Sequence, residues 1–235
     1  MYDKLFHGIV FFALASAVFP ECRADHLWII PEPVGFDARV HVCINHEWQP
    51  DRLQRLSKAQ LWRISDVKAC KPVEVAIDEK SLIAKGLTDD PGSTYAMSYD
   101  CGVSFTDGEP NRVYLHAKSH TSADLSTWRT LCDAKRFPLE IVSTRDRNRF
   151  KFSVSFNGKS LAYPVVTVRG PDAFVREVQG DAQGQFSCEL PQSGMYGICT
   201  TFVDSRPGEL GGRAFIETRH LSTLTLPIEV IPSRK

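Results

Sequence analysis

The chain has 235 residues, and 28 Lys and Arg balance 28 Asp and Glu, so its formal net charge is zero. A protein that binds nucleic acid needs a basic face to neutralise phosphates, so the balanced charge argues against that class. It also gives no electrostatic reason for attachment to an anionic membrane surface. The length suits one large domain or two small ones.

The first 24 residues have the pattern of a secretion signal. Lys4 precedes an apolar run at residues 9–19, which is shorter than the about 20 residues that a transmembrane helix needs. Cleavage is predicted after Ala24, which leaves Asp25 as the mature N-terminus, and cleavage after Ala17 is the alternative. We therefore expect an exported protein, periplasmic or secreted, without a membrane anchor.

The first half of the mature chain, residues 25–136, is predicted to be a β-sandwich that ends in a helix. Apolar residues alternate with polar ones in short segments separated by turn sequences. These predicted strands are residues 26–30, 38–44, 59–64, 73–77, 95–99 and 112–117. The predicted helix spans residues 122–135, where Ser122 is a suitable cap and Leu125, Trp128 and Leu131 recur at helical spacing.

The second half, residues 137–235, has the stronger β pattern. Phe152, Val154 and Phe156 alternate along one strand, and Asn157-Gly158 is a strong hairpin signal. Six or seven short strands in about 100 residues predict an immunoglobulin-like or transthyretin-like sandwich. The predicted fold class is therefore all-β, with two sandwich domains in tandem and one short helix between them.

The cysteine content fits export. Removal of the signal leaves an even number of cysteines, which predicts disulfide bonds without fixing their connectivity. These are Cys43, Cys70, Cys101, Cys132, Cys188 and Cys199. Cys188 and Cys199 flank one turn and are the predicted local pair, and partial pairing with one or two buried thiols is the alternative. No CxxC motif occurs, which argues against a zinc ribbon or a thioredoxin-type site.

Two stretches of sequence resemble known families. Residues 156–198, which contain FNGKSLAYPVVTV and DAQGQFSCELPQSGMYGI, are similar to carboxypeptidase-regulatory and collagen-adhesin-type sandwiches. A second resemblance covers nearly the whole mature chain through DHLWIIP (25–31), LHAKSH (115–120), PLEIV (138–142) and RHLSTLT (219–225). In order and spacing these elements resemble the bacterial exported family catalogued as domain of unknown function 4198, in which the second element leads into a helix.

The second resemblance implies a function. Some members of that family are described as accessory proteins of nickel or cobalt uptake. We therefore expect a protein that binds a transition-metal ion, nickel or copper first, and presents it to a membrane uptake transporter.

The predicted mature N-terminus offers donors for such a metal. Asp25 supplies an α-amine and His26 an imidazole, and with the amide nitrogen between them they suit planar binding of Cu(II) or Ni(II). The amine titrates near neutrality, so a metal displaces its proton at modest cost. The alternative is an ordinary chain end with an accidental histidine.

Two further histidines are candidate ligands. His46 follows the predicted strand 38–44, and His220 begins the last predicted strand and matches a histidine of the family. Both are expected to converge with Asp25 and His26 at one end of the first sandwich. The alternative is that each is an ordinary surface or hydrogen-bonded histidine.

His116 and His120 are four residues apart, which allows shared metal binding on a helix but separates the side chains by about 13 Å on a strand. Because residues 113–116 are predicted to be a strand that runs into the helix, this pair is not expected to share a metal. His116 is kept as a reserve ligand. Lys118 is expected to pair with an acid such as Asp124 or Glu140.

Catalytic motifs are lacking, since the sequence contains no GxSxG, HExxH or GxGxxG. The chain is therefore predicted not to be an enzyme. A copper monooxygenase would require histidine at the first mature position, where this chain has Asp25. The competing hypothesis is a sandwich module for adhesion or interaction that binds a protein or a glycan and uses no metal.

Overall fold

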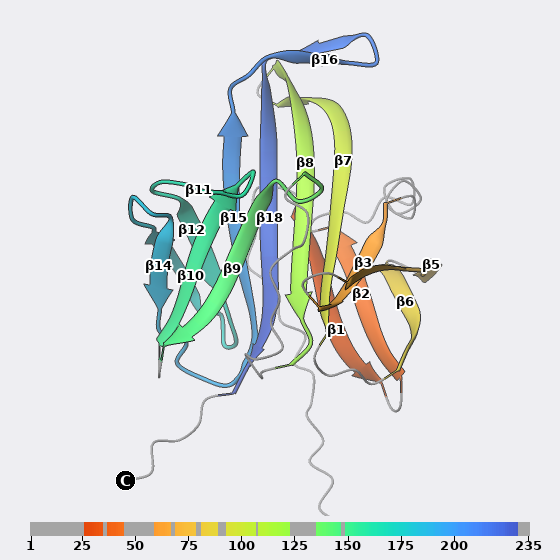
Figure 1. The fold of residues 1–235 in the computed structure, drawn as a ribbon, viewed down its shortest axis with the longest axis vertical. Coiled ribbons are helices and arrows are strands. Elements are labelled where there is room, and N and C mark those ends of the chain that lie inside the picture. The colour runs from red at the N-terminus through yellow and green to blue at the C-terminus, as the bar shows by residue number, and fades with distance from the viewer. Residues whose placement is uncertain are drawn as a thin grey trace, which may run out of the picture.

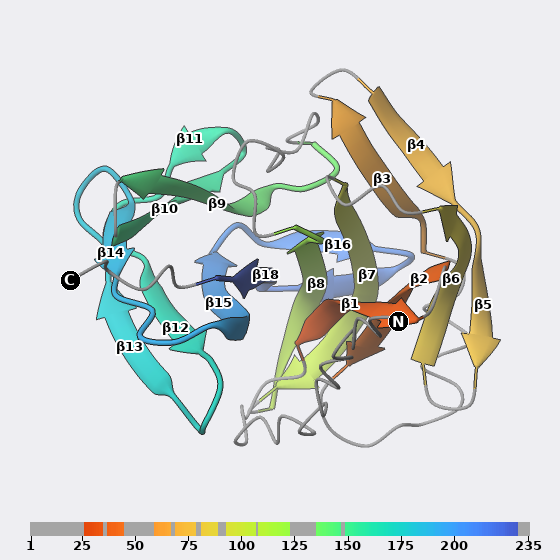
Figure 2. The same ribbon diagram turned by 90° about the horizontal axis from the view of Figure 1, so that it is seen from below.

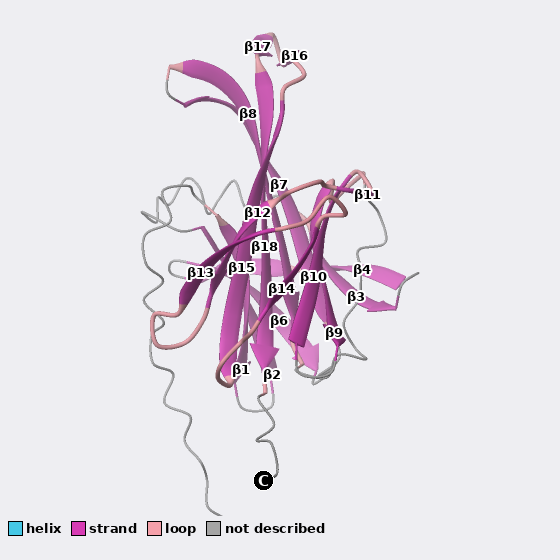
Figure 3. Cartoon of the chain, turned by 90° about the vertical axis from the view of Figure 1, so that its left-hand side faces the viewer, coloured by secondary structure: helices cyan, strands magenta, loops and turns pink. Residues whose placement is uncertain are grey.

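The computed structural model of the protein describes residues 26–34, 37–44, 59–66, 69–78, 81–88, 93–106, 108–122, 135–146 and 149–229. These residues form an all-β structure without a helix (Figure 3), which confirms the all-β part of the predicted fold class. The predicted signal and residues 123–134 of the predicted helix lie outside them. Within the described ranges no helix is long and apolar enough to cross a membrane.

A central sheet of eight strands organises the molecule (Figure 1). Its order is β13 (Val175–Gln179), β12 (Val165–Arg169), β15 (Gly194–Asp204), β18 (Glu217–Ile228), β8 (Glu109–His120), β7 (Thr94–Thr106), β3 (Leu61–Asp66) and β4 (Ala69–Val73). Neighbouring strands are antiparallel except β18 and β8, which are parallel. This one parallel pair joins the two halves of the chain in a single sheet.

Two smaller sheets flank the central one, and seen along the long strands they lie on opposite sides of the molecule (Figure 2). The N-terminal sheet has the order β1 (Leu27–Val34), β2 (Asp37–Ile44), β6 (Ser81–Thr88) and β5 (Val75–Asp78). The C-terminal sheet has the order β11 (Lys159–Ser160), β10 (Arg149–Phe156) and β14 (Gln185–Cys188), and β9 (Leu139–Asp146) also pairs with β10. A separate hairpin, β16 (Gly208–Leu210) and β17 (Arg213–Phe215), lies beyond the ends of the central strands.

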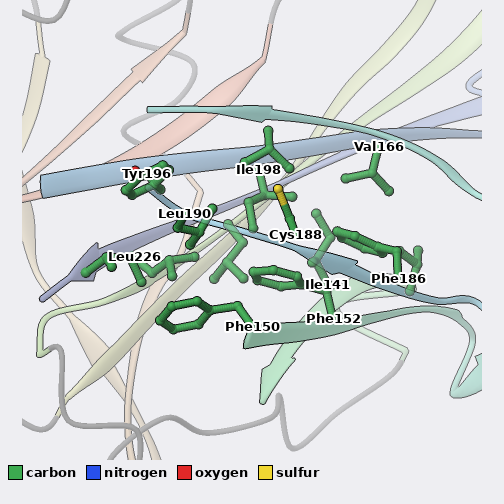
Figure 4. Close-up of a cluster of buried hydrophobic side chains, with 14 of the residues drawn as sticks. Ile141, Phe150, Phe152, Val166, Phe186, Cys188, Leu190, Tyr196, Ile198 and Leu226 are labelled. Atoms are coloured by element: carbon green, nitrogen blue, oxygen red, sulfur yellow. The ribbon is translucent and has the colours of Figure 1, made fainter. Parts of the chain in front are cut away.

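Each smaller sheet packs on a different face of the central sheet. The larger core lies between the C-terminal sheet and one face, where Phe152, Phe186 and Ile198 are buried (Figure 4). The other core lies between β1 and the opposite face, where Leu27, Leu115 and Leu221 are buried. Side chains alternate along a strand, so Leu115 and Leu221 face away from their neighbours His116 and His220. The two faces of the central sheet are therefore both buried over much of its area.

The sequence predicted which segments are strands better than it predicted where each strand begins and ends. All six predicted strands of the first half overlap an observed strand, whereas β6 was not predicted. The Asn157-Gly158 turn is confirmed, because both residues have positive φ, at 51° and 74°, as a two-residue hairpin requires. Residues 123–134, which make up most of the helix into which LHAKSH is expected to lead, lie outside the described residues, and residues 117–120 are strand. They continue β8 because each is paired with β7, from Met97 to Thr94.

The predicted disulfide between Cys188 and Cys199 is also wrong, since both are buried thiols. Cys188 packs in the core under the C-terminal sheet. Cys199 lies on the opposite face of β15, because its neighbour Ile198 points into that same core and successive side chains of a strand alternate. On its own face Cys199 is next to Gly197, which lies against the Trp28 ring. The central sheet thus separates two cysteines that are close in sequence.

The thiols differ in accessibility, which gives a first prediction. Cys101 is exposed, so in the native protein we expect an alkylating reagent to modify Cys101 at least about tenfold faster than Cys188 or Cys199, because only an accessible thiolate reacts. Burial also raises the pKa of the Cys188 thiol. Peptide mass spectrometry after timed labelling reads the three sites separately. Rapid native labelling of Cys188 would contradict the packing described above. Cys70, in contrast, is disulfide-bonded and is not expected to react.

Candidate functional site

Buried histidines mark the face of the central sheet that is turned toward the C-terminal sheet. His116 on β8 and His220 on β18 are 2% and 5% exposed. In the parallel pair, Tyr114 lies opposite His220 and Ser222 lies opposite His116. Buried polar side chains are more informative than exposed apolar ones, so this row is the candidate site.

A chain of hydrogen bonds links three side chains in this row. Ser98 Oγ on β7 is 2.9 Å from His116 Nδ1, and His116 Nε2 is 3.1 Å from His220 Nδ1. Two tautomers satisfy both bonds. In one, His116 donates from Nε2 to His220 and accepts from the Ser98 hydroxyl; in the other, His220 donates from Nδ1 and His116 donates from Nδ1 to Ser98.

Aromatic rings hold the two imidazoles in place. The Tyr114 ring is within 6° of parallel to both histidine rings, with centroids 5.3 Å from His220 and 6.0 Å from His116. Phe156 of β10 meets His220 edge-on at 5.0 Å. The Arg112 guanidinium lies 4.6 Å from the centroid of the Tyr114 ring. Side chains of β8 and β10 therefore restrict the orientation of these rings.

Burial keeps both histidines neutral. It lowers the pKa of His116 to about 3, and the neighbouring His220 contributes in the same direction. Burial likewise lowers the pKa of His220 to about 4; Asp204 opposes this shift, whereas Arg112 and Arg206 add to it. At neutral pH each imidazole therefore has one unprotonated nitrogen.

His120 is a separate feature of the same strand. Its Nδ1 bonds to Thr94 Oγ1 at 2.9 Å, and burial lowers its pKa well below the ordinary range. Since His116 and His120 both lie on β8, their side chains are about 13 Å apart and do not share a ligand. Between them, Lys118 Nζ pairs with Glu140 Oε1 at 2.7 Å, which confirms Glu140 as an acidic partner, and Asp124 lies outside the described residues.

The structure unites only part of the predicted ligand set. His116, the reserve ligand, meets His220, whereas Asp25 and His46 lie outside the described residues. His26 is buried and precedes β1. Thr223 Oγ1 donates to Leu27 O at 2.5 Å, and Thr223 faces the opposite side of β18 from His220. His26 and His220 therefore lie on opposite faces of the central sheet.

Sequence reasoning missed the residues that surround the pair. Ser98, Tyr114 and Asp204 carry no motif, and their only signal is a polar group at an alternating position within a strand. Among the described residues no group of three or more His, Cys, Asp or Glu is already assembled to hold a metal ion. The two histidines alone therefore do not form a complete metal site.

The geometry permits two kinds of chemistry. A hydroxyl bonded to a histidine that is oriented by a third group is the arrangement of a nucleophile and its general base. However, a general base works best with a pKa near the operating pH, and that of His116 is about 3. Metal binding instead requires neutral imidazoles, and the burial of this pair supplies them.

The spacing of the facing nitrogens also suits metal binding. Metal–nitrogen bonds of about 2.0–2.1 Å place two nitrogens about 2.9 Å apart when they bind side by side at a right angle. The observed separation of His116 Nε2 and His220 Nδ1 is 3.1 Å. When His116 carries its proton on Nδ1, donated to Ser98, and His220 carries its proton on Nε2, both facing nitrogens have free lone pairs, and a metal ion would replace the hydrogen bond between them. Binding of one ion requires the rings to rotate, so that both lone pairs point at one position rather than at each other.

Comparisons with known proteins do not assign the chain to a family. No family model matches the chain, and no curated protein matches it. Among solved structures, a pullulanase from Anoxybacillus sp. LM18-11 complexed with maltotriose is 8% identical, with a TM-score of 0.18 over 75% of this chain and 24% of that chain. Another structure of pullulanase from the same source is 8% identical, with a TM-score of 0.19 over 82% of this chain and 27% of that chain. The chain thus spans about a quarter of these proteins, and TM-scores this low support no inference about fold or activity.

Proposed function

We propose that this is an exported protein that binds one transition-metal ion, nickel or copper first, through His116 and His220. The observation that carries the proposal is the pair of neutral, buried imidazoles whose facing nitrogens are 3.1 Å apart. Ser98 supports it as an outer partner that can accept the Nδ1 proton of His116 and so leave its Nε2 to the metal. Presentation of the metal to a membrane uptake transporter follows from the resemblance of the sequence and is part of the same proposal.

Replacement of His116 or His220 by alanine is expected to abolish retention of the metal. Each substitution removes one of two ligands, so the loss in affinity should exceed the about 10–100-fold cost of removing an outer partner. Native mass spectrometry of the full exported chain with equimolar Ni(II) or Cu(II) reads the bound ion directly. Ser98→Ala is expected to weaken binding by about 10–100-fold.

His120→Ala is the matched control. It removes a buried histidine from the same strand and the same face, together with its bond to a hydroxyl, but not from the pair. It should keep the metal. Retention by His116→Ala and His220→Ala would contradict the proposal, and loss on His26→Ala or on acetylation of the N-terminus would move the site to Asp25 and His26.

An interaction module without a metal is the second candidate. It is supported by exposed apolar side chains at the projecting end of the central sheet. This end comprises residues 100–106, 108–112 and 203–219 and extends past the C-terminal sheet (Figures 1 and 3). There Phe105 is 75% exposed and Ile216 is 46% exposed. If neither metal is retained by a correctly processed chain, a protein- or glycan-binding role through this end becomes the working hypothesis.

A further inference from the structure

Strand β7 runs well past the strand that pairs with its outer edge. β3 pairs only with residues 94–97 of β7, whereas β7 continues to Thr106. Beyond a bulge between Asp100 and Gly102, residues 102–106 pair regularly with β8 on their inner edge. Among the described strands, none pairs with their outer edge, which lies at the projecting end (Figure 1). An unpaired edge of this kind is a template for another strand.

The backbone of two residues points out of this edge. Phe105 lies opposite Pro110, which has no N–H, and Pro110 O accepts a hydrogen bond from Ile216 N on the β18 side at 3.0 Å. Hydrogen-bonded and non-hydrogen-bonded pairs alternate in an antiparallel ladder, so Phe105 and Pro110 form a pair of the second type. The N–H and C=O of Phe105 therefore point away from β8, and by the same alternation so do those of Val103.

The two outermost strands of the central sheet, β4 and β13, have features that oppose pairing with a further strand. Pro72 in β4 has no N–H to donate. Full-length antiparallel pairing of β13 with its own copy would place Glu177 opposite itself, and like charges in that position are destabilising. Residues 102–106 of β7 contain neither a charged residue nor a proline. Their edge is therefore open to pairing with itself.

We propose that the protein forms a two-fold symmetric dimer in which residues 102–106 of β7 pair with the same residues of a second copy. With the two-fold axis at Ser104, Val103 lies opposite Phe105 of the partner subunit. This register joins the residues whose backbone points outward, and it matches an aromatic side chain with a β-branched one. It also covers part of the Phe105 side chain, which is 75% exposed in one copy.

Such a contact closes at two copies, because the same surface is used on both sides. It joins the two central sheets into one continuous sheet and does not involve the histidine pair. A single strand pair is small beside the interfaces of permanent dimers, so we expect a dissociation constant in the micromolar range. Unfolding experiments at lower protein concentration therefore measure the monomer.

Charge substitutions at the two-fold axis test the dimer. Ser104 lies opposite itself, so Ser104→Lys and Ser104→Asp each place two like charges together and should weaken dimerisation at least about tenfold. An equimolar mixture of the two variants should dimerise, because Lys then meets Asp. Sedimentation velocity of the full exported chain over a series of concentrations measures each state, and an unchanged melting temperature shows that each variant is folded.

Cross-linking tests the register without adding charge. Ser104 and its copy form a non-hydrogen-bonded pair, in which the Cα atoms are about 4.5 Å apart and within the range of a disulfide. In a Cys101→Ser background, Ser104→Cys should therefore become a covalent dimer with oxidised glutathione. Glu177→Cys in the same background is the matched control on the edge of β13, where residue 177 is also exposed, and should remain a monomer.

A wild-type chain that stays monomeric at all concentrations would overturn the dimer. Dimers that persist unchanged in both Ser104→Lys and Ser104→Asp would place the contact elsewhere and overturn the role of β7. Failure of the mixed variants to dimerise, together with no cross-link at Ser104→Cys, would overturn the register. Assemblies larger than two would contradict a contact that closes on itself, and a wild-type strand edge that captures only an unrelated protein would exclude a second copy as its partner.

Discussion

Replacement of Phe152 by alanine is expected to lower the free energy of unfolding by about 3–5 kcal/mol. Phe152 is 2% exposed, and its ring lies 4.9 Å from the Phe186 ring of β14 in the core shown in Figure 4. The substitution loses the transfer free energy of the ring and leaves a cavity that a rigid sheet fills only in part. Urea unfolding followed by tryptophan fluorescence measures the change.

Phe105→Ala is the matched control for this prediction. It makes the same chemical change at a side chain that is 75% exposed, so stability should change by no more than about 0.5 kcal/mol. Similar losses in the two variants would contradict the assignment of the core. Phe156, whose ring meets His220 edge-on, lies on the same strand as Phe152. The core around Phe152 therefore also positions the Phe156 ring against His220.

Acidification below about pH 6.5 is expected to destabilise the protein before most carboxylates titrate. The pKa values of folded His116 and His220, about 3 and about 4, lie below the ordinary value of 6.5 because of burial. The unfolded chain therefore binds more protons in this window, and stability falls as the pH falls from about 6.5 toward 4. Each histidine contributes up to about 1.4 kcal/mol per pH unit to this fall in the free energy of unfolding.

The double variant His116→Gln/His220→Gln tests the source of this acid sensitivity. It should unfold with a clearly smaller dependence on pH between 6.5 and 4.5, whereas Phe105→Ala should keep the wild-type dependence. Urea unfolding at half-unit pH steps gives both slopes. His220→Gln alone, which leaves His116 its bond to Ser98, should remove part of the slope. Identical slopes in all four proteins would contradict the assignment of two neutral buried histidines.

The strand content and the side-chain faces could be predicted from the sequence because alternation is local. Phe152, Val154 and Phe156 alternate on β10 as the sequence predicted, and the Asn157-Gly158 turn follows from two residues that tolerate positive φ. Glu140 as a partner of Lys118 was also within reach of sequence reasoning, since it was one of two acids considered. These features depend on a few neighbouring residues.

The site could not be predicted, because it depends on which strands are neighbours. His116 and His220 are 104 residues apart, and only the parallel pairing of β8 with β18 brings their nitrogens to 3.1 Å. A period of two assigns a residue to one of two faces but does not say which strand lies beside it. For the same reason the sequence suggested a bond between Cys188 and Cys199 across a sheet that separates them.

The sequence by itself therefore determined that the described chain is all-β, where its strands recur and which side chains alternate inward. Only the tertiary structure decided that strands from both halves share one sheet and that His116, not His26, meets His220. The physical reason is that backbone pleating and turn geometry are encoded over two to four residues. Strand order, in contrast, is set by the burial of both faces of the central sheet, a property of the whole molecule.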